Sequence, residues 1–307
     1  MLQSLHILPL LHVGGPEPIG FPYTHWIIEP GVAVVMMIMT IGYFLAVGPL
    51  NRRRPGAENR PVSNAQIRWF ILGQVFLLIS LGPPLDDWSY HFFASVHMVQ
   101  HLLLMFAVIP CWIKGTPPWM LRPLLNNPVG RFMLTKAPRA LPGFVIATMI
   151  IVLWHFPELY NLTLENQFIH ALQHAAFLVA GFLFFWPIMS TLPEAPQLQP
   201  LMKCLYLFLQ TIPSGVVGAM IVNAAPGLYP HYEKASQRPF GLSLAEDQVL
   251  SGVIMWVGMN TVFLAMISVI FLRYAASEEK KDQEAIQSGK AVTRIVPVKE
   301  PSGVHTV

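Results

Sequence analysis

Charged residues are scarce in this chain: Asp, Glu, Lys and Arg together make up 11% of its 307 residues. A typical soluble domain has about a quarter of its residues charged. Hydrophobic residues reach 54%, so the few charged side chains could not cover a water-soluble core of this size. The composition excludes an ordinary soluble protein and favours one whose outer surface faces lipid.

Cysteine is also rare, with Cys111 and Cys204 as its two occurrences and no Cys-x-Cys or Cys-x-x-Cys motif. This excludes the common thiolate metal sites and a disulfide-rich scaffold. Both cysteines are expected near the inner ends of their helices, where a structural disulfide is not expected. We interpret them as small apolar packing residues.

Long apolar runs, in contrast, are abundant. A helix needs about 20 mostly apolar residues to cross a bilayer, and seven stretches come close to that length, near residues 31–50, 66–83, 92–113, 142–157, 168–189, 202–223 and 249–272. The predicted fold class is all-α, a polytopic membrane bundle of seven transmembrane helices. Residues 31–275 form this domain, residues 1–30 an external arm without a cleaved signal, and residues 276–307 a disordered cytoplasmic tail.

The distribution of basic residues predicts the orientation of the bundle. Of the 19 Lys and Arg, all but Lys234 and Arg238 fall in loops or tails that share one side of a seven-helix topology. The positive-inside rule places that side in the cytoplasm, with the N-terminus outside and the C-terminus inside. The formal net charge of +3 then reflects membrane orientation, and no nucleic-acid partner is expected.

Two helices repeat the pattern H-x-x-Q-H, as "HMVQH" at 97–101 and "HALQH" at 170–174. Histidines four residues apart share a helix face, so His97 and His101 can point at one partner, as can His170 and His174. The predicted topology places His155 at a similar depth on the outer half of the membrane. Neutral imidazoles grouped in this way suit zinc, copper, iron or nickel. Alternatively, they hydrogen-bond between helices without any metal.

The same helices carry little that could support hydrolysis. A metalloprotease helix reads H-E-x-x-H, with the glutamate as general base, whereas Gln100 and Gln173 stand in this chain. No enzyme is expected, and no small-molecule substrate. Two alternatives for the histidines remain open: a haem clamped between helices, or Cu(I), which the methionines slightly favour because it accepts thioethers. Those methionines are Met98, Met220, Met255 and Met259.

Other features indicate a cavity or a cation path. Pro213, Gly215 and Gly218 in "TIPSGVVGAM" are expected to break or thin the sixth helix and to permit close approach or a pocket. A transporter would use such a broken helix at the midplane. Asp86 and Asp87 are predicted outer carboxylates that could attract a cation or serve as ordinary solvated loop charges. No inverted repeat supports transport.

Several stretches resemble one family. "HMVQHLLLMFAVIP" followed by "KGTPPWMLRPLL", "LWHFPELYN" with "IHALQHAAFLVAGFLFFWP", and the later "GLYPHY" and "FGLSLAEDQVLSGVIMW" resemble the CtaG-type cytochrome c oxidase assembly factors of bacteria. The resemblance covers residues 25–275. It implies a seven-helix protein of the bacterial plasma membrane that helps to mature haem-copper oxidases through copper delivery. By resemblance, the site positions are His97, His101, His155, His170 and His174, with Asp247 and Tyr229 as secondary candidates.

Together, these arguments predict an outer-facing histidine chamber that receives Cu(I) and passes it to a cytochrome c oxidase subunit. His97, His101, His170 and His174 are the expected primary metal ligands, and His155 is an auxiliary one. A membrane cytochrome, a cation transporter and a metal-free assembly scaffold remain as alternatives.

Overall fold

The computed structural model describes residues 28–52, 62–235 and 238–288, and all regular structure in those residues is helical. Six helical segments are long and apolar enough to cross a membrane, and a seventh is reached if α8 and α9, bent by 90°, count as one span. The predicted all-α membrane bundle is confirmed. The orientation of its termini stays a prediction, and the external arm expected at residues 1–30 lies almost wholly outside the described residues.

The first half of the chain contains α1 (Pro30–Val47), α2 (Pro49–Arg52), α3 (Asn64–Leu81), α4 (Leu85–His91), α5 (Ala94–Leu103), the π-helical η2 (Leu104–Val108), α6 (Ile109–Gly115), α7 (Pro118–Leu121), η3 (Arg122–Asn126) and α8 (Pro128–Thr135). The second half contains α9 (Ala140–Trp154), α10 (Pro157–Glu165), α11 (Gln167–Met189), α12 (Pro200–Asn223), η4 (Pro230–Lys234), η5 (Pro239–Gly241), α13 (Leu244–Val253), the π-helical η6 (Ile254–Gly258) and α14 (Met259–Gln287).

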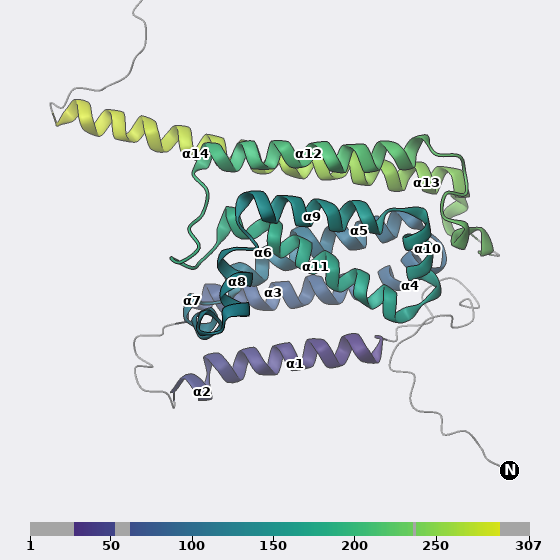
Figure 1. Ribbon diagram of the computed structural model, residues 1–307, viewed down its shortest axis with the longest axis horizontal. Helices are drawn as coiled ribbons and strands as arrows, with labels where there is room; N and C mark the ends of the chain where they lie inside the picture. The colour runs from purple at the N-terminus through teal and green to yellow at the C-terminus, as the bar shows by residue number, and fades with distance from the viewer. Residues whose placement is uncertain (1–27, 53–61, 236–237, 289–307) are drawn as a thin grey trace, which may run out of the picture.

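The long helices run side by side in layers, with α12 and α13–α14 forming one side and α1 the opposite side (Figure 1). Between them, α11 packs on α9 and α6, and α3 packs on α6. The continuous segment from α5 to α6 is the most buried of the spans. Residues on this segment are therefore enclosed by protein, which makes it the natural place for side chains that must avoid lipid.

Helix α1 is different because it makes few contacts with the rest of the bundle, mainly with α3. Its apolar side chains, such as Val35, Ile38 and Ile41, are exposed, as expected of a surface that contacts lipid. Tyr43 is its buried anchor: the hydroxyl donates to the Gly115 carbonyl at 2.9 Å and the ring stacks on Phe70. Thr40 accepts from the Gln74 side chain at 3.0 Å, and Met36 packs against Leu77, so α1 is held to the bundle at several points although most of its surface is exposed.

The sixth predicted span differs from the expectation of a broken helix. Helix α12 is continuous through Pro213, so the midplane break that a transporter would use is absent from this described helix. Gly218 instead allows α12 to approach α13 closely, because a Cβ at Gly218 would lie 2.6 Å from the Gly252 carbonyl oxygen. Small residues that permit such backbone contact are typical of helix interfaces in membranes.

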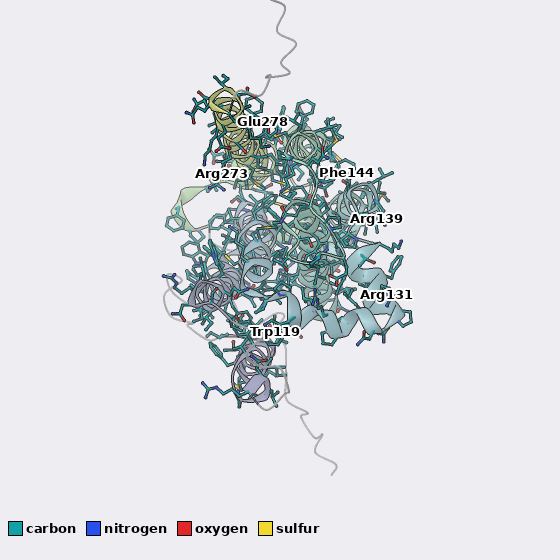
Figure 2. The ribbon with its side chains drawn as sticks, turned by 90° about the vertical axis from the view of Figure 1, so that its left-hand side faces the viewer. Trp119, Arg131, Arg139, Phe144, Arg273 and Glu278 are labelled. Carbon is teal, nitrogen blue, oxygen red and sulfur yellow. The ribbon has the colours of Figure 1, made fainter. Side chains whose placement is uncertain are left out.

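Basic residues gather at one end of the bundle, where α8 turns by 90° into α9. Arg122, Arg131, Lys136 and Arg139, with Glu194, line a surface cavity of about 660 Å³. Arg131 and Arg139 project from the end of the bundle that faces the viewer in Figure 2. Helix α2 and the end of α14 lie toward this same end (Figure 1), the arrangement that a common cytoplasmic side requires.

Helix α14 continues to Gln287, whereas a tail without secondary structure was expected from residue 276. Ion pairs between Lys280 and Glu284 (3.8 Å) and between Lys281 and Glu278 (2.7 Å) lie along its exposed end. Pairs at these spacings support a helix, as do the good helix formers around them. Residues 289–307 of the predicted tail lie outside the described residues. Cys111 and Cys204 are both free, as predicted.

Candidate metal centre

The site begins with the placement of α5. A side chain from α13 caps its first turn: Asp247 accepts hydrogen bonds from the backbone N–H groups of Ala94 (2.8 Å) and Ser95 (3.1 Å), and from the Ser95 hydroxyl at 2.5 Å. A carboxylate at this position satisfies two of the N–H groups that a helix leaves unpaired and complements its dipole. Asp247 therefore fixes the start of the helix that carries His97 and His101.

Three imidazoles converge at this buried place. The candidate ligand nitrogens of His97, His101 and His174 all lie within 4.8 Å of one another. His97 and His101 are fully buried, and His174 is half-buried. The rings of His97 and His101 are 4.4 Å apart, and each lies about 6 Å from the ring of His174 (6.1 and 6.0 Å). Helices α5 and α11 thus present their histidine faces to each other.

Four ring nitrogens of this triad are available to a metal because they lack a hydrogen-bond partner among the described residues. His97 Nε2, His174 Nε2 and both ring nitrogens of His101 are buried without a hydrogen-bond partner among the described residues. Burying a polar group without a partner costs about 1–3 kcal/mol, so four such atoms in one place require an explanation. A metal with bonds of about 2.0–2.1 Å to imidazole nitrogens supplies one. Nitrogens within 4.8 Å of one another are close enough to share one such ion.

His170 adjoins the triad without being part of it. Its ring lies 4.3 Å from that of His174 and 5.5 Å from that of His97. Its Nε2 is also buried and unpartnered among the described residues. A small movement of this side chain would add a fourth imidazole to the set.

His155 approaches from α9 on the other side of His101, with the two rings 6.0 Å apart. Its Nδ1 is 2.6 Å from the Ile151 carbonyl oxygen, and its Nε2 is 3.3 Å from the Met98 sulfur. All five predicted histidines therefore lie around one place in the bundle. The ligand nitrogens of His97, His101 and His174 are close enough to share one metal ion, and His155 and His170 lie beside them.

A group of tyrosines covers the Nδ1 side of the His97 ring. Tyr232 in η4 donates its hydroxyl proton to the Ser89 carbonyl (2.8 Å), and its oxygen lies 3.3 Å from His97 Nδ1. Burial raises the pKa of Tyr232 well above its usual value, so the phenol stays neutral. Because its proton is used, the oxygen accepts from His97 Nδ1–H, which leaves the Nε2 lone pair free. Outer partners commonly orient metal-binding histidines in this way.

Two further tyrosines extend this contact. The Tyr160 hydroxyl lies 3.0 Å from that of Tyr232, and its ring stacks on Tyr229 at 3.9 Å. Tyr229 donates to the His155 carbonyl at 3.1 Å. The resemblance had indicated Tyr229, but Tyr160 and Tyr232 were missed. The signal was present in the sequence, since "PELYN" and "LYPHY" place tyrosines in the segments that follow or precede predicted spans.

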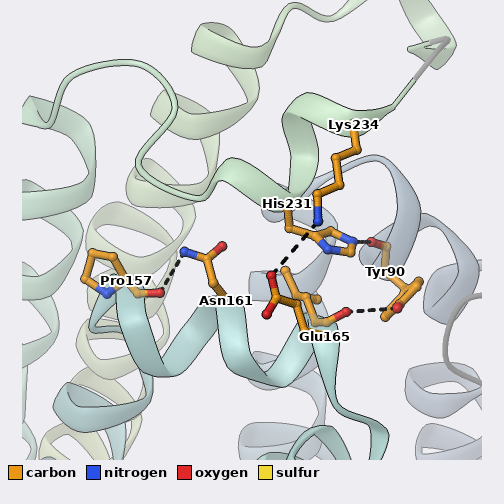
Figure 3. A network of polar contacts seen from close by, with 7 residues as sticks. Tyr90, Pro157, Asn161, Glu165, His231 and Lys234 are labelled. Carbon is orange, nitrogen blue, oxygen red and sulfur yellow. Dashed lines mark hydrogen bonds and ion pairs between the residues drawn. The ribbon is translucent and has the colours of Figure 1, made fainter.

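A second set of polar contacts holds the segment around η4 in place beside the tyrosines (Figure 3). His231 Nε2 lies 3.1 Å from the Tyr90 carbonyl oxygen, and the Tyr90 hydroxyl donates to the Leu164 carbonyl at 2.9 Å. Lys234 and Glu165 form an exposed ion pair at 4.0 Å. Burial lowers the pKa of His231. These contacts join α4, α10 and η4 into a cover over the histidines.

A cavity of about 350 Å³ reaches the histidines from the side of α1. His170 and His174 contribute to its wall, together with Asp86 of α4 and Met36 and Met39 of α1. Asp86 accepts from the Gln100 side chain at 2.7 Å, so this predicted outer carboxylate points inward rather than into a solvated loop. The cavity connects His170 and His174 of this group with the side of the bundle that α1 covers.

Together, the fold and this site define a polytopic helical membrane protein with a buried histidine centre near one end of its bundle. The chain belongs to the cytochrome c oxidase caa3 assembly factor (Caa3_CtaG) family, whose sequence pattern it matches over residues 41–277. The predicted family resemblance is thus confirmed.

Curated relatives come from mycobacteria and are uncharacterized. The chain is 23% identical over 293 residues to proteins of Mycobacterium bovis and Mycobacterium tuberculosis, covering 86% of this chain and 42% of each relative. A protein of Mycobacterium leprae is 20% identical over 285 residues, covering 84% of this chain and 40% of the relative. The chain therefore spans less than half the length of these relatives. No solved structure matches it.

Proposed function

We propose that this protein is a membrane assembly factor that binds copper at His97, His101 and His174 and delivers it to a cytochrome c oxidase subunit. The observation that carries the proposal is the convergence of three imidazoles within 4.8 Å of one another, with four of their nitrogens buried and unpartnered among the described residues. Family membership supplies the oxidase as the partner class. The family also supports a non-catalytic role in a bacterial plasma membrane.

The ligand chemistry favours a metal that is carried and released. Imidazole ligands suit copper and zinc, and three neutral rings bring no negative charge to hold the ion strongly. A carrier needs this moderate affinity, whereas a permanent cofactor site is already fitted to its ion.

The cavity beside α1 supports loading or transfer of the cargo. Its wall combines the imidazoles of His170 and His174 with the carboxyl group of Asp86 and the thioethers of Met36 and Met39. These groups all bind cations, and they connect the triad to the edge of the bundle. On the predicted topology, this end of the bundle faces outward, the side on which we expect the client oxidase to take copper.

The experiment that tests the proposal measures metals and visible absorption in one preparation. The full-length protein is purified in mild detergent, loaded anaerobically with Cu(I), desalted and analysed by mass spectrometry. We expect bound copper in the wild type and its loss in His97→Ala and His174→Ala. His231→Gln is the matched control, because His231 lies at the same end of the bundle but bonds the Tyr90 carbonyl.

The outcomes separate the proposal from its alternatives. A Soret band in the preparation would identify a cytochrome and contradict the copper proposal. Copper content that is the same in the wild type and in both triad variants would also contradict it. In cells, the triad variants should reduce oxidase copper while His231→Gln does not; intact oxidase maturation in all variants would indicate a metal-free scaffold.

A further inference from the structure

The contact between His155 and Met98 has no ordinary explanation. His155 Nε2 and the Met98 sulfur are 3.3 Å apart, and both side chains are completely buried. At 2.6 Å, His155 Nδ1 is close enough to the Ile151 carbonyl oxygen that it must carry the proton and donate it. Nε2 then has a lone pair and no hydrogen, and a thioether sulfur has no hydrogen to offer. Two electron-pair donors therefore face each other with no proton between them.

From this geometry we infer a soft metal site formed by His155 and Met98, selective for Cu(I), beside the imidazole triad. With metal–nitrogen and metal–sulfur bonds of about 2.0 and about 2.3 Å, a separation of 3.3 Å corresponds to an angle of about 100° at the ion. That angle suits a three- or four-coordinate ion. Thioether ligands select Cu(I) over zinc and over harder cations. The inference rests on the proposed copper function and adds a thioether ligand, Met98, to the proposed imidazole ligands.

His101 is placed to serve both groups of ligands. Its ring lies 6.0 Å from the ring of His155 and 6.0 Å from the ring of His174. Neither of its nitrogens has a hydrogen-bond partner among the described residues, so neither is committed to a structural role. Met98 and His101 are three residues apart on α5 and share a face of that helix. An ion can therefore pass between the triad and the His155–Met98 pair by exchanging ligands around His101.

This exchange needs no electron or proton donor. Cu(I) keeps its oxidation state, one nitrogen or sulfur lone pair replaces another, and the proton stays on His155 Nδ1, which donates it to the Ile151 carbonyl oxygen. The contact also distinguishes Met98 from other buried methionines. Met255 and Met259 are similarly buried, but among the described residues neither sulfur lies within hydrogen-bond distance of an imidazole nitrogen, as that of Met98 does.

The test is X-ray absorption spectroscopy of the full-length protein in detergent, loaded anaerobically with Cu(I) alone, comparing the wild type with Met98→Leu. This substitution keeps the side chain apolar and similar in volume but removes the sulfur. Met255→Leu is the matched control. We expect a sulfur scatterer at about 2.3 Å from copper in the wild type and in Met255→Leu, and its loss in Met98→Leu.

Binding measurements complete the test. Cu(I) affinity should fall about 10–100-fold or more in Met98→Leu, because loss of even an outer hydrogen-bond partner weakens a metal site by that factor. Zn(II) affinity depends on the imidazoles and should stay unchanged. Unchanged Zn(II) affinity also shows that the variant is folded. A nitrogen-only copper environment in the wild type, or a sulfur signal that persists in Met98→Leu, would overturn the inference and leave the triad in place. Absence of any bound copper would instead overturn the proposed function itself.

Discussion

Replacing His101 with phenylalanine should make the metal-free protein more stable while removing its metal binding. His101 is 1% exposed, and both of its ring nitrogens are unpartnered among the described residues. Its ring stacks on Phe177 with centroids 3.9 Å apart. Phenylalanine keeps that aromatic stacking and removes two polar atoms that are buried at a cost of about 1–3 kcal/mol per group.

The extra volume of phenylalanine offsets part of this gain, because overpacking a core costs about 1–3 kcal/mol. We therefore expect His101→Phe to raise the free energy of unfolding by about 1–3 kcal/mol, measured by thermal unfolding of the metal-free protein in detergent. Copper binding should be lost in the same variant. Stability that is gained when a functional group is removed is characteristic of a site held for function rather than for folding.

Gln100→Leu is the control on the neighbouring residue. Gln100 is equally buried, but its amide donates to the Ser80 carbonyl (2.8 Å) and to Asp86 (2.7 Å). Gln100→Leu removes the donor from the Ser80 carbonyl and from Asp86 and should destabilise the protein by about 1–3 kcal/mol. If His101→Phe is destabilised as much as Gln100→Leu and still binds copper, the imidazole has a structural role and the reasoning fails.

Three further predictions follow from the surroundings of the triad. Asp247→Ala removes the carboxylate that caps α5, so its melting temperature should drop measurably and its copper affinity should weaken; a variant as stable as the wild type would contradict the capping role. Tyr232→Phe removes the hydroxyl that orients His97 and should weaken copper binding about 10–100-fold with little change in helicity by circular dichroism. Burial lowers the pKa of His231, so its imidazole is protonated at a lower pH in the folded state than in the unfolded chain. Stability should fall as the pH drops below about 6.5, and His231→Gln should reduce that dependence in melting curves at pH 7.5 and 5.5.

Much of the architecture could be predicted from hydropathy, because a bilayer imposes long apolar helices. The histidines were predicted to gather because pairs four residues apart on two helices have to face a protected interior. Predicting that these histidines lie at a similar depth in the membrane required the positive-inside rule. The structure brings all five together around α5, and His97, His101 and His174 lie closest to a common ligand geometry.

The resemblance indicated Asp247 as a secondary candidate, but the sequence could not show how Asp247 or Tyr232 holds these rings in place. Asp247 caps α5 from a position more than 150 residues away, and Tyr232 reaches His97 from a loop between spans. Such contacts depend on tertiary packing, which periodicity does not reveal. The roles of Gln100 were missed for the same reason: the amide turns toward α3 and α4 instead of the histidines.

Two local expectations failed because tertiary context or helix propensity prevailed. Pro213 does not interrupt α12, since neighbouring helices in a membrane bundle can accommodate the hydrogen bond that proline lacks. The charged segment after residue 276 is helical to Gln287, because its oppositely charged side chains pair at helical spacing. That second signal was available in the sequence, in the Glu and Lys residues of "SEEKKDQEAIQ".

The most direct measurement of the central claim is anomalous scattering at the copper edge from crystals of the full-length protein loaded with Cu(I). We expect a peak inside the bundle, within bonding distance of imidazole nitrogens from His97, His101 and His174. A copper peak elsewhere in the molecule, with these three rings still unoccupied at saturating copper, would contradict it.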